Sequence, residues 1–162
     1  MSQLNPAHIA SLLELLNQSP YSRLLSMEIT AMGPGHALVA AALGEKHRNT
    51  FGGLHGGVHA SVIETAAYWA LYCDLPEDAG MVTLDLAVTD LAPAKNGELR
   101  AEARRIKAGR TICLAEVTVT DATGKLLAHG TSKLMVTPGL QSVRQSVAAM
   151  GREPLPPKFL DS

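Results

Sequence analysis

The sequence is poor in charge. Only 18% of its 162 residues are Asp, Glu, Lys or Arg, and the formal net charge at pH 7 is −1. A chain so close to neutral has no overall field that would attract nucleic acid or an acidic membrane surface, so we expect neither as a partner. The hydrophobic content of 46% is typical of a globular chain, and the length fits one domain.

Cysteine and long hydrophobic runs are also scarce. The two cysteines, Cys73 and Cys113, form no motif, which favours free buried thiols in a reducing compartment over a disulfide framework. Near the N-terminus there is no basic stretch, and Glu14 and Asn17 interrupt the apolar positions. We therefore expect no signal peptide, no transmembrane span and a cytoplasmic protein.

The most informative stretch runs from residue 47 to residue 74. A Gly-rich turn at 52–57 leads into a segment that is apolar on almost every side and extends to about Cys73. A helix without a polar face must be enclosed, most simply by a sheet. Glu64 lies in the middle of this helix, and a carboxylate there requires either partners or a function.

The start of this helix has the properties of an anion site. The amides of Gly56 and Gly57 lie at the helix N-terminus, where unpaired N–H groups and the helix dipole favour negative charge, and a substrate can approach both residues closely. An oxyanion hole for acyl transfer has these requirements. Glu64 is eight residues further on, about 12 Å along the axis and about 80° around it. If Gly56 and Glu64 serve one site, we expect them to come from two subunits of a two-fold dimer.

The remaining chain predicts an α+β domain. Asn5 is expected to cap a first helix over residues 6–18, and a short turn then leads to Leu25. The alternation of Val82, Leu84 and Leu86 with more polar residues indicates a strand. Expected strands are 27–32, 36–43, 82–89, 99–107, 110–120 and 126–137, the last four as a meander with an exposed edge that dimerisation would cover. We place the domain at 1–137, with 1–24 as N-terminal helix and turn, and a C-terminal extension at 138–162, with a short helix near 141–150 and a Pro-rich tail, 153–161.

Several motifs in this order resemble those of hotdog-fold acyl-CoA thioesterases, particularly the PaaI-like group. The resemblance covers roughly residues 25–137 and rests on Asn49, Gly53-Leu54-His55-Gly56-Gly57, Glu64-Thr65-Ala66, Val82-Thr83-Leu84-Asp85-Leu86, Leu91-Ala92-Pro93-Ala94, Lys107-Ala108-Gly109-Arg110 and Asp121-Ala122-Thr123-Gly124-Lys125. It implies an antiparallel sheet wrapped around one long central helix. The implied activity is hydrolysis of an acyl-CoA thioester without a cofactor, since coenzyme A is part of the substrate.

The resemblance also implies roles for five residues. Glu64 matches the catalytic carboxylate, acting as nucleophile or as general base, and the Gly56 amide matches the oxyanion donor. His55 either orients the substrate carbonyl or only caps the helix. Asn49 matches an amide that binds the nucleophilic water or the carboxylate, and would otherwise be a turn former. Thr83 matches a Ser or Thr near the leaving group, and would otherwise be an ordinary strand residue.

Two further groups are candidates for substrate binding. Tyr68 and Tyr72 follow Glu64 on or near its helix face and could form the wall of an acyl pocket, or could belong to the core or an interface. Lys107, Gly109 and Arg110 lie in a basic hairpin that could bind the phosphates of coenzyme A, or could be a solvated face.

A metal site is not expected. His55 and His59 are four residues apart and His47 is nearby, which raises zinc as a candidate. However, no HExxH pattern exists, no cysteine pair is near, and no third ligand is specified.

Two other functions compete with hydrolysis. An enoyl-thioester hydratase or dehydratase shares the hotdog fold but pairs a His with the acid and differs in motif spacing. A non-catalytic acyl-CoA-binding module would have no need for Glu64 together with Gly56 and Asn49. The sequence leaves open the acyl chain, the choice between a dimer and a dimer of dimers, and the role of the C-terminal extension.

Overall fold

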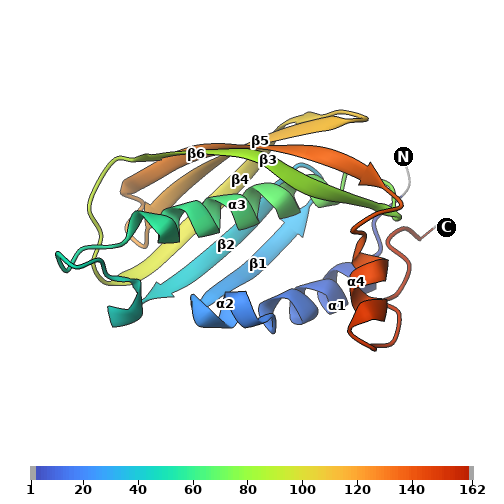
Figure 1. Cartoon of the computed structure of the whole chain (residues 1–162), viewed down its shortest axis with the longest axis horizontal. Helices are drawn as coiled ribbons and strands as arrows, with labels where there is room; N and C mark the ends of the chain where they lie inside the picture. The colour runs from blue at the N-terminus through green and yellow to red at the C-terminus, as the bar shows by residue number, and fades with distance from the viewer. Residues whose placement is uncertain (1–2, 161–162) are drawn as a thin grey trace.

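The computed structural model describes residues 3–160. A six-stranded antiparallel sheet wraps around the long helix α3, Gly56–Tyr72, which lies across its concave face (Figure 1). The shorter helices α1, α2 and α4 lie along one side of the molecule, away from the centre of the sheet. The expected α+β arrangement, with the sheet wrapped around one central helix, is confirmed.

The order of strands in the sheet differs from the expected meander. The strands are β1 (Met27–Gly33), β2 (His36–Leu43), β3 (Ala79–Asp90), β4 (Gly97–Ala108), β5 (Ile112–Asp121) and β6 (Leu126–Pro138), and their spatial order is β1-β2-β4-β5-β6-β3. Only β4, β5 and β6 form a meander. The prediction was wrong for β3, which pairs with β6 at the far edge, because α3 carries the chain across the sheet from β2 before β3 begins.

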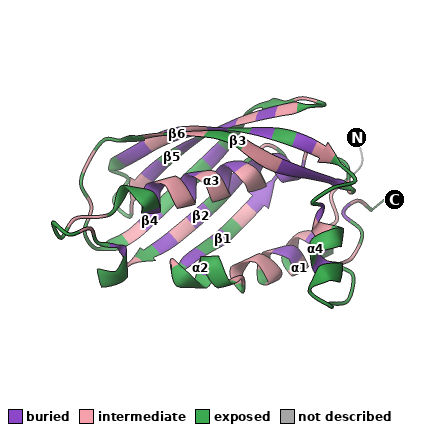
Figure 2. Ribbon diagram, in the orientation of Figure 1, coloured by how far each residue is buried: buried purple, intermediate pink, exposed green. Residues whose placement is uncertain are grey.

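The core lies between α3 and the sheet. Figure 2 shows buried positions concentrated where the strands face the helix. Alanines on α3 allow a close approach, and Gly130 on β6 allows it further, since a Cβ there would lie 3.0 Å from a methyl group of Ile63. The fully enclosed helix residues are Val62, Ile63, Ala66, Ala67, Ala70 and Leu71.

The two edges of the sheet are treated differently. At the β1 edge, the side chain of Asn17 accepts a hydrogen bond from Ile29 N–H at 2.8 Å and donates one to Ile29 O at 3.0 Å. The Asn17 side chain therefore pairs with the backbone N–H and C=O of Ile29 as a neighbouring strand would. At the start of the β3 edge, Met81 forms a backbone hydrogen bond with the Tyr68 side chain, and Gly80 lies against the backbone of Leu140 and Gln141. Further along, no strand within residues 3–160 pairs with the outer side of β3, and Leu84 is 50% exposed. An uncovered edge of this kind is open to pairing with another chain.

The N-terminal region follows the sequence pattern with one addition. Helix α1 spans Pro6–Asn17, and the Asn5 side chain caps it by accepting a hydrogen bond from Ala7 N–H at 3.0 Å, as predicted. The expected turn before Leu25 is instead a short helix, α2, Pro20–Leu24, which Pro20 starts at a favourable position. A single 3₁₀ turn, Glu45–His47, lies in the loop before α3.

The C-terminal extension packs back onto the domain. Helix α4 spans Val143–Ala149 and begins with a capping box formed by Ser142 and Gln145. The Pro-rich tail then runs beside the N-terminus, where Leu4 and Phe159 form an antiparallel bridge (Figure 1). The last residue of the expected tail, Asp161, lies outside the described residues.

Lys158 anchors this tail. Its ammonium is fully buried, donates to Tyr72 O at 2.6 Å and Leu75 O at 2.7 Å, and lies 3.8 Å from the centre of the Tyr72 ring. It thereby adds a donor to two carbonyls at and just after the end of α3, of which Tyr72 O also accepts a hydrogen bond from Leu75 N–H at 3.2 Å. Burial lowers the pKa of Lys158 to about 8. Beside it, burial raises the pKa of the Cys73 thiol to about 11.

Both cysteines are free and buried, as predicted. Within residues 3–160, every helix is too short or too polar to cross a membrane.

We expect Lys158 to make stability depend on alkaline pH. In the unfolded chain a lysine keeps a pKa near 10.4, so between about pH 8 and that value the unfolded state binds more protons. The cost of burying the charge is therefore present below pH 8 and is relieved as pH rises. Relative to Lys158→Met, the wild-type free energy of unfolding should increase by about 2 kcal/mol between about pH 7.5 and 9.5, measured by urea denaturation. The exposed Lys125→Met variant is the control. If the difference in the free energy of unfolding between wild type and Lys158→Met does not change with pH, the lowered pKa of Lys158 is contradicted.

Candidate active site

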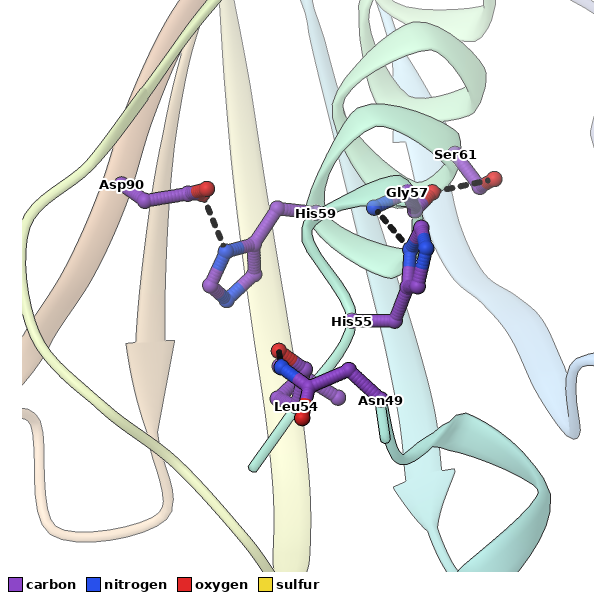
Figure 3. Close-up of polar contacts among 7 residues, drawn as sticks. All are labelled: Asn49, Leu54, His55, Gly57, His59, Ser61 and Asp90. Atoms are coloured by element: carbon purple, nitrogen blue, oxygen red, sulfur yellow. Dashed lines mark hydrogen bonds and ion pairs between the residues drawn. The ribbon is translucent and has the colours of Figure 1, made fainter. Parts of the chain in front are cut away.

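The N-terminus of α3 presents one unused amide. His55 is the N-cap residue, and its Nδ1 accepts a hydrogen bond from Gly57 N–H at 2.9 Å (Figure 3). Gly56 is exposed, and its N–H donates to no acceptor among residues 3–160. Because Nδ1 of His55 accepts, the proton of a neutral ring is on Nε2, which can then donate to a ligand. The helix-capping role of His55 is thus present, and it leaves Gly56 N–H and His55 Nε2–H as donors.

Asn49 shapes the loop that leads to this helix. Its Oδ1 accepts hydrogen bonds from Phe51 N–H at 2.9 Å and Gly53 N–H at 3.2 Å. Its Nδ2 donates to Leu54 O at 3.4 Å. The turn-forming role of Asn49 is therefore visible in the structure, and both lone pairs of its amide oxygen are occupied.

A His–Asp pair lies next to this loop, and the sequence analysis did not single it out as a site. His59 Nδ1 and Asp90 Oδ1 are 2.6 Å apart, joining the first turns of α3 to the end of β3 (Figure 3). A Cβ at residue 56 would lie 2.9 Å from Asp90 Oδ2, so Gly56 leaves room for this carboxylate. The only sequence signal was that His59 follows His55 by one helical turn; nothing linked it to Asp90.

Asn49, His59 and Asp90 border a groove of about 390 Å³ beside the start of α3. The groove lies between the loop before the helix and the segment that follows β3. Its lining residues are Asn49, Gly53, Leu54, His59, Asp90, Leu91, Ala92, Pro93 and Ala94.

Glu64 has a partner on β3. Its half-buried carboxylate accepts a hydrogen bond from Thr83 Oγ1 at 2.9 Å. Thr83 is near the start of β3, whereas Asp90, which lies against Gly56, is its last residue. Glu64 and Gly56 therefore lie against different parts of the same strand, Thr83 in its first half and Asp90 at its end, in agreement with their expected separation along the helix. The structure brings Thr83 and Glu64 together but does not bring Gly56 to them within one chain.

The two tyrosines lie away from the groove. Tyr72 is buried, and its hydroxyl is 2.8 Å from His8 Nε2 under the C-terminal tail. Burial also raises its pKa. Tyr72 therefore lies at the opposite end of α3 from Gly56, packed in the core of its own chain, and the role of the two tyrosines in an acyl pocket stays a prediction. Tyr68 is half-buried with its ring edge-to-face against Trp69, and burial is again the main cause of its raised pKa.

The basic hairpin lies level with Thr83. Cys113, just after the turn, pairs with Leu134, which pairs with Thr83. Gly109 N–H closes the turn by donating to Ile112 O at 3.1 Å. The hairpin therefore lies at the far end of β3 from Gly56 and cannot join that groove within one chain.

The basic residues of this region divide into two groups. Three are paired with carboxylates, namely Arg100 with Glu98, Arg104 with Glu102, and Arg105 with Asp74. Lys107 and Arg110, both exposed, have no carboxylate partner within residues 3–160.

Histidine ligands for a metal are not assembled. His47 is buried and uses both ring nitrogens, one toward Gly44 N–H at 2.9 Å and one toward Leu25 O at 2.7 Å. In the part of the chain that the structure describes, no three His, Cys, Asp or Glu side chains are grouped as metal ligands.

Comparison with known proteins identifies the family. The family model described as "Thioesterase superfamily" matches residues 51–128. Acyl-coenzyme A thioesterase 13 of Homo sapiens is 34% identical over 113 residues, which are 68% of this chain and 80% of that protein. The chain belongs to the hotdog-fold thioesterase superfamily. It is a thioester hydrolase.

A further relative and a solved structure support the same family. This thioesterase is 32% identical over 103 residues to a 1,4-dihydroxy-2-naphthoyl-CoA hydrolase of Listeria monocytogenes, covering 64% of this chain and 84% of that protein. The crystal structure of thioesterase HI1161 from Haemophilus influenzae superposes with a TM-score of 0.77 at 27% identity, covering 87% of this chain and 98% of that one. The hotdog fold implied by the sequence motifs is confirmed.

We expect Glu64→Gln to lower kcat of this thioesterase by at least about 10²-fold, because it keeps the shape but removes the charge. Thr83→Val should cost about 10-fold, since it removes only the hydrogen bond that orients the carboxylate. Steady-state thiol release measures both, with circular dichroism to check folding and the exposed Glu153→Gln as the matched control. Turnover of Glu64→Gln close to that of wild type would contradict the assignment of Glu64.

Proposed function

We propose that the thioesterase hydrolyses acyl-CoA thioesters at a site shared by two subunits. The observation that carries this proposal is the placement of the two candidate groups along β3. Gly56 lies beside the last residue of the strand, and the Glu64 carboxylate is bonded to Thr83 in its first half. No strand within residues 3–160 pairs with the outer side of β3, so a second chain can pair there and bring its own Glu64 to this Gly56.

The symmetry of an antiparallel edge pairing supports this composite site. Two β3 strands that pair about a two-fold axis run in opposite directions, so the Thr83 end of one lies beside the Asp90 end of the other. Glu64 is bonded to Thr83, and Gly56 lies against Asp90. The pairing therefore places Glu64 of the partner subunit near Gly56 in each of two equivalent sites.

Coenzyme A is the thiol that this arrangement favours. Named relatives act on acyl-CoA, and the same two-fold pairing moves the hairpin of the partner subunit to the Gly56 end of β3. Lys107 and Arg110 of that hairpin have no carboxylate partner within residues 3–160, so both can contact phosphates.

The chemistry follows from the charges that develop during acyl transfer. Gly56 N–H, with His55 Nε2–H beside it, donates to the thioester carbonyl oxygen as that oxygen becomes negative. The Glu64 carboxylate drives the attack on the carbonyl carbon, either directly or through water. The thiolate is a good leaving group, so the reaction requires no cofactor.

A coupled assay for free thiol over a panel of acyl-CoA substrates tests the function. Thiol release from at least one short, medium or aromatic acyl-CoA is the expected result. Addition of water to the double bond of an enoyl-CoA without thiol release would favour a hydratase and contradict the proposal.

Mixed dimers test the shared site. Let one variant carry Asn49→Ala, which loosens the loop before Gly56, and the other Glu64→Gln. Both homodimers should be nearly inactive, whereas a mixed dimer collects both lesions in one site and leaves the other native. Random association of equal amounts makes about half the dimers mixed, so about a quarter of wild-type activity should return. No recovery, with mixed dimers verified by two affinity tags, would refute the composite site.

Arg110→Glu tests the phosphate contact. We expect it to raise KM for acyl-CoA by about 10-fold or more with little change in kcat, because a phosphate contact stabilises substrate and transition state alike. A short acyl thioester without the nucleotide should be hydrolysed at an unchanged rate. Equal losses on both substrates would show that the hairpin has a different role.

A further inference from the structure

His59 has an unsatisfied nitrogen at the candidate active site. The residue is only 3% exposed, and its Nδ1 is held by Asp90 Oδ1 at 2.6 Å. Because a carboxylate only accepts, Nδ1 carries the proton and a neutral ring has its lone pair on Nε2. This Nε2 is buried and has no hydrogen-bond partner among residues 3–160. Such an acceptor calls for a donor that the isolated chain does not supply.

The position of this nitrogen points to the reaction rather than to folding. His59 lines the groove with Asn49 and Leu54, and Figure 3 shows its ring on the same side of α3 as these two residues. Its partner Asp90 lies against Gly56. Two neighbouring acceptors are occupied, since Asn49 Oδ1 takes two loop amides and His55 Nδ1 takes Gly57 N–H. The unpartnered lone pair of His59 Nε2 and the second oxygen of Asp90 are left as acceptors at this groove.

We propose that His59, oriented by Asp90, accepts a proton from the water that releases the acyl group from Glu64 of the partner subunit. The inference rests on the proposed function. It assigns the attack on the thioester to Glu64 and the hydrolysis of the resulting acyl-Glu64 intermediate to His59. A His held at Nδ1 by a carboxylate and open at Nε2 is the arrangement that general bases use in acyl transfer. Asp90 acts as a positioning residue, which fixes the tautomer of His59.

The two steps balance as follows. First, a carboxylate oxygen of Glu64 bonds to the thioester carbon, the C–S bond breaks, and coenzyme A leaves as the thiolate. Second, His59 Nε2 takes a proton from water while the water oxygen bonds to the same carbon. The bond from that carbon to Glu64 then breaks and restores the carboxylate. The proton on His59 passes to the thiolate, so the products are the acid and the free thiol.

Burst kinetics of His59→Gln separate this role from a structural one. Glutamine can still donate to Asp90 but cannot take up a proton. With enzyme near substrate concentration, this variant should release about one equivalent of thiol per site rapidly, and then turn over at least about 10²-fold more slowly than wild type. Mass spectrometry should find the acyl group on Glu64. The cysteines of the protein are both buried, so a thiol reagent reports coenzyme A.

Two further variants complete the test. Asp90→Asn should keep the initial equivalent and slow the later turnover by about 10-fold, because it orients His59 less well. His129→Gln, on the opposite face of the sheet, is the control and should match wild type. Wild-type turnover of His59→Gln, or slow turnover without the initial equivalent, would overturn this inference while leaving acyl-CoA hydrolysis intact. A wild-type protein that releases no thiol from any acyl-CoA would overturn both.

Discussion

The burial of α3 is the constraint on which the rest of the structure depends. Its core-facing residues are small or aliphatic, and residues such as Ala66, Ala67 and Ala70 are fully enclosed. A helix of this kind is stable only inside a curved sheet, and the small side chains let the strands approach it closely. The sheet covers only one side of the helix. Glu64 lies outside that fully enclosed face, where a carboxylate can be half-buried and still meet Thr83 and a substrate.

The backbone groups at the two ends of α3 differ in their hydrogen bonding. At the C-terminal end, the buried Lys158 ammonium of the tail donates to the carbonyls of Tyr72 and Leu75. At the N-terminal end, His55 takes the Gly57 amide and leaves the Gly56 amide open. The helix dipole favours positive charge at the first end and negative charge at the second. The same physical property thus anchors the C-terminal extension and supplies the candidate oxyanion donor.

Local sequence patterns predicted the helices and strands more accurately than they predicted which elements lie side by side in the fold. The Asn5 cap, the apolar helix and the strand β3 each depend on residues close in sequence, and each was correct. The expected alternation along β3 is interrupted at Leu84, which is exposed where the register shifts between Thr83 and Asp85. The place of β3 beside β6 depends on how α3 crosses the sheet, which no local pattern records. The contact between His59 and Asp90 is a consequence of that crossing, so it was not predicted. The contacts of Tyr72 with His8 and Lys158 join segments from both ends of the chain, so no local pattern records them either.

The corrected place of β3 also makes a shared site possible. A meander of β3, β4, β5 and β6 would instead place β3 beside β4. At the far edge, the same strand carries the contact of Glu64 at one end, the contact of Gly56 at the other, and an unpaired backbone between them. An antiparallel pairing of two such edges exchanges the ends. The crossing of α3, which encloses the core, therefore also places Gly56 and Glu64 against different parts of β3, and in the proposed dimer a second chain would bring the two groups together.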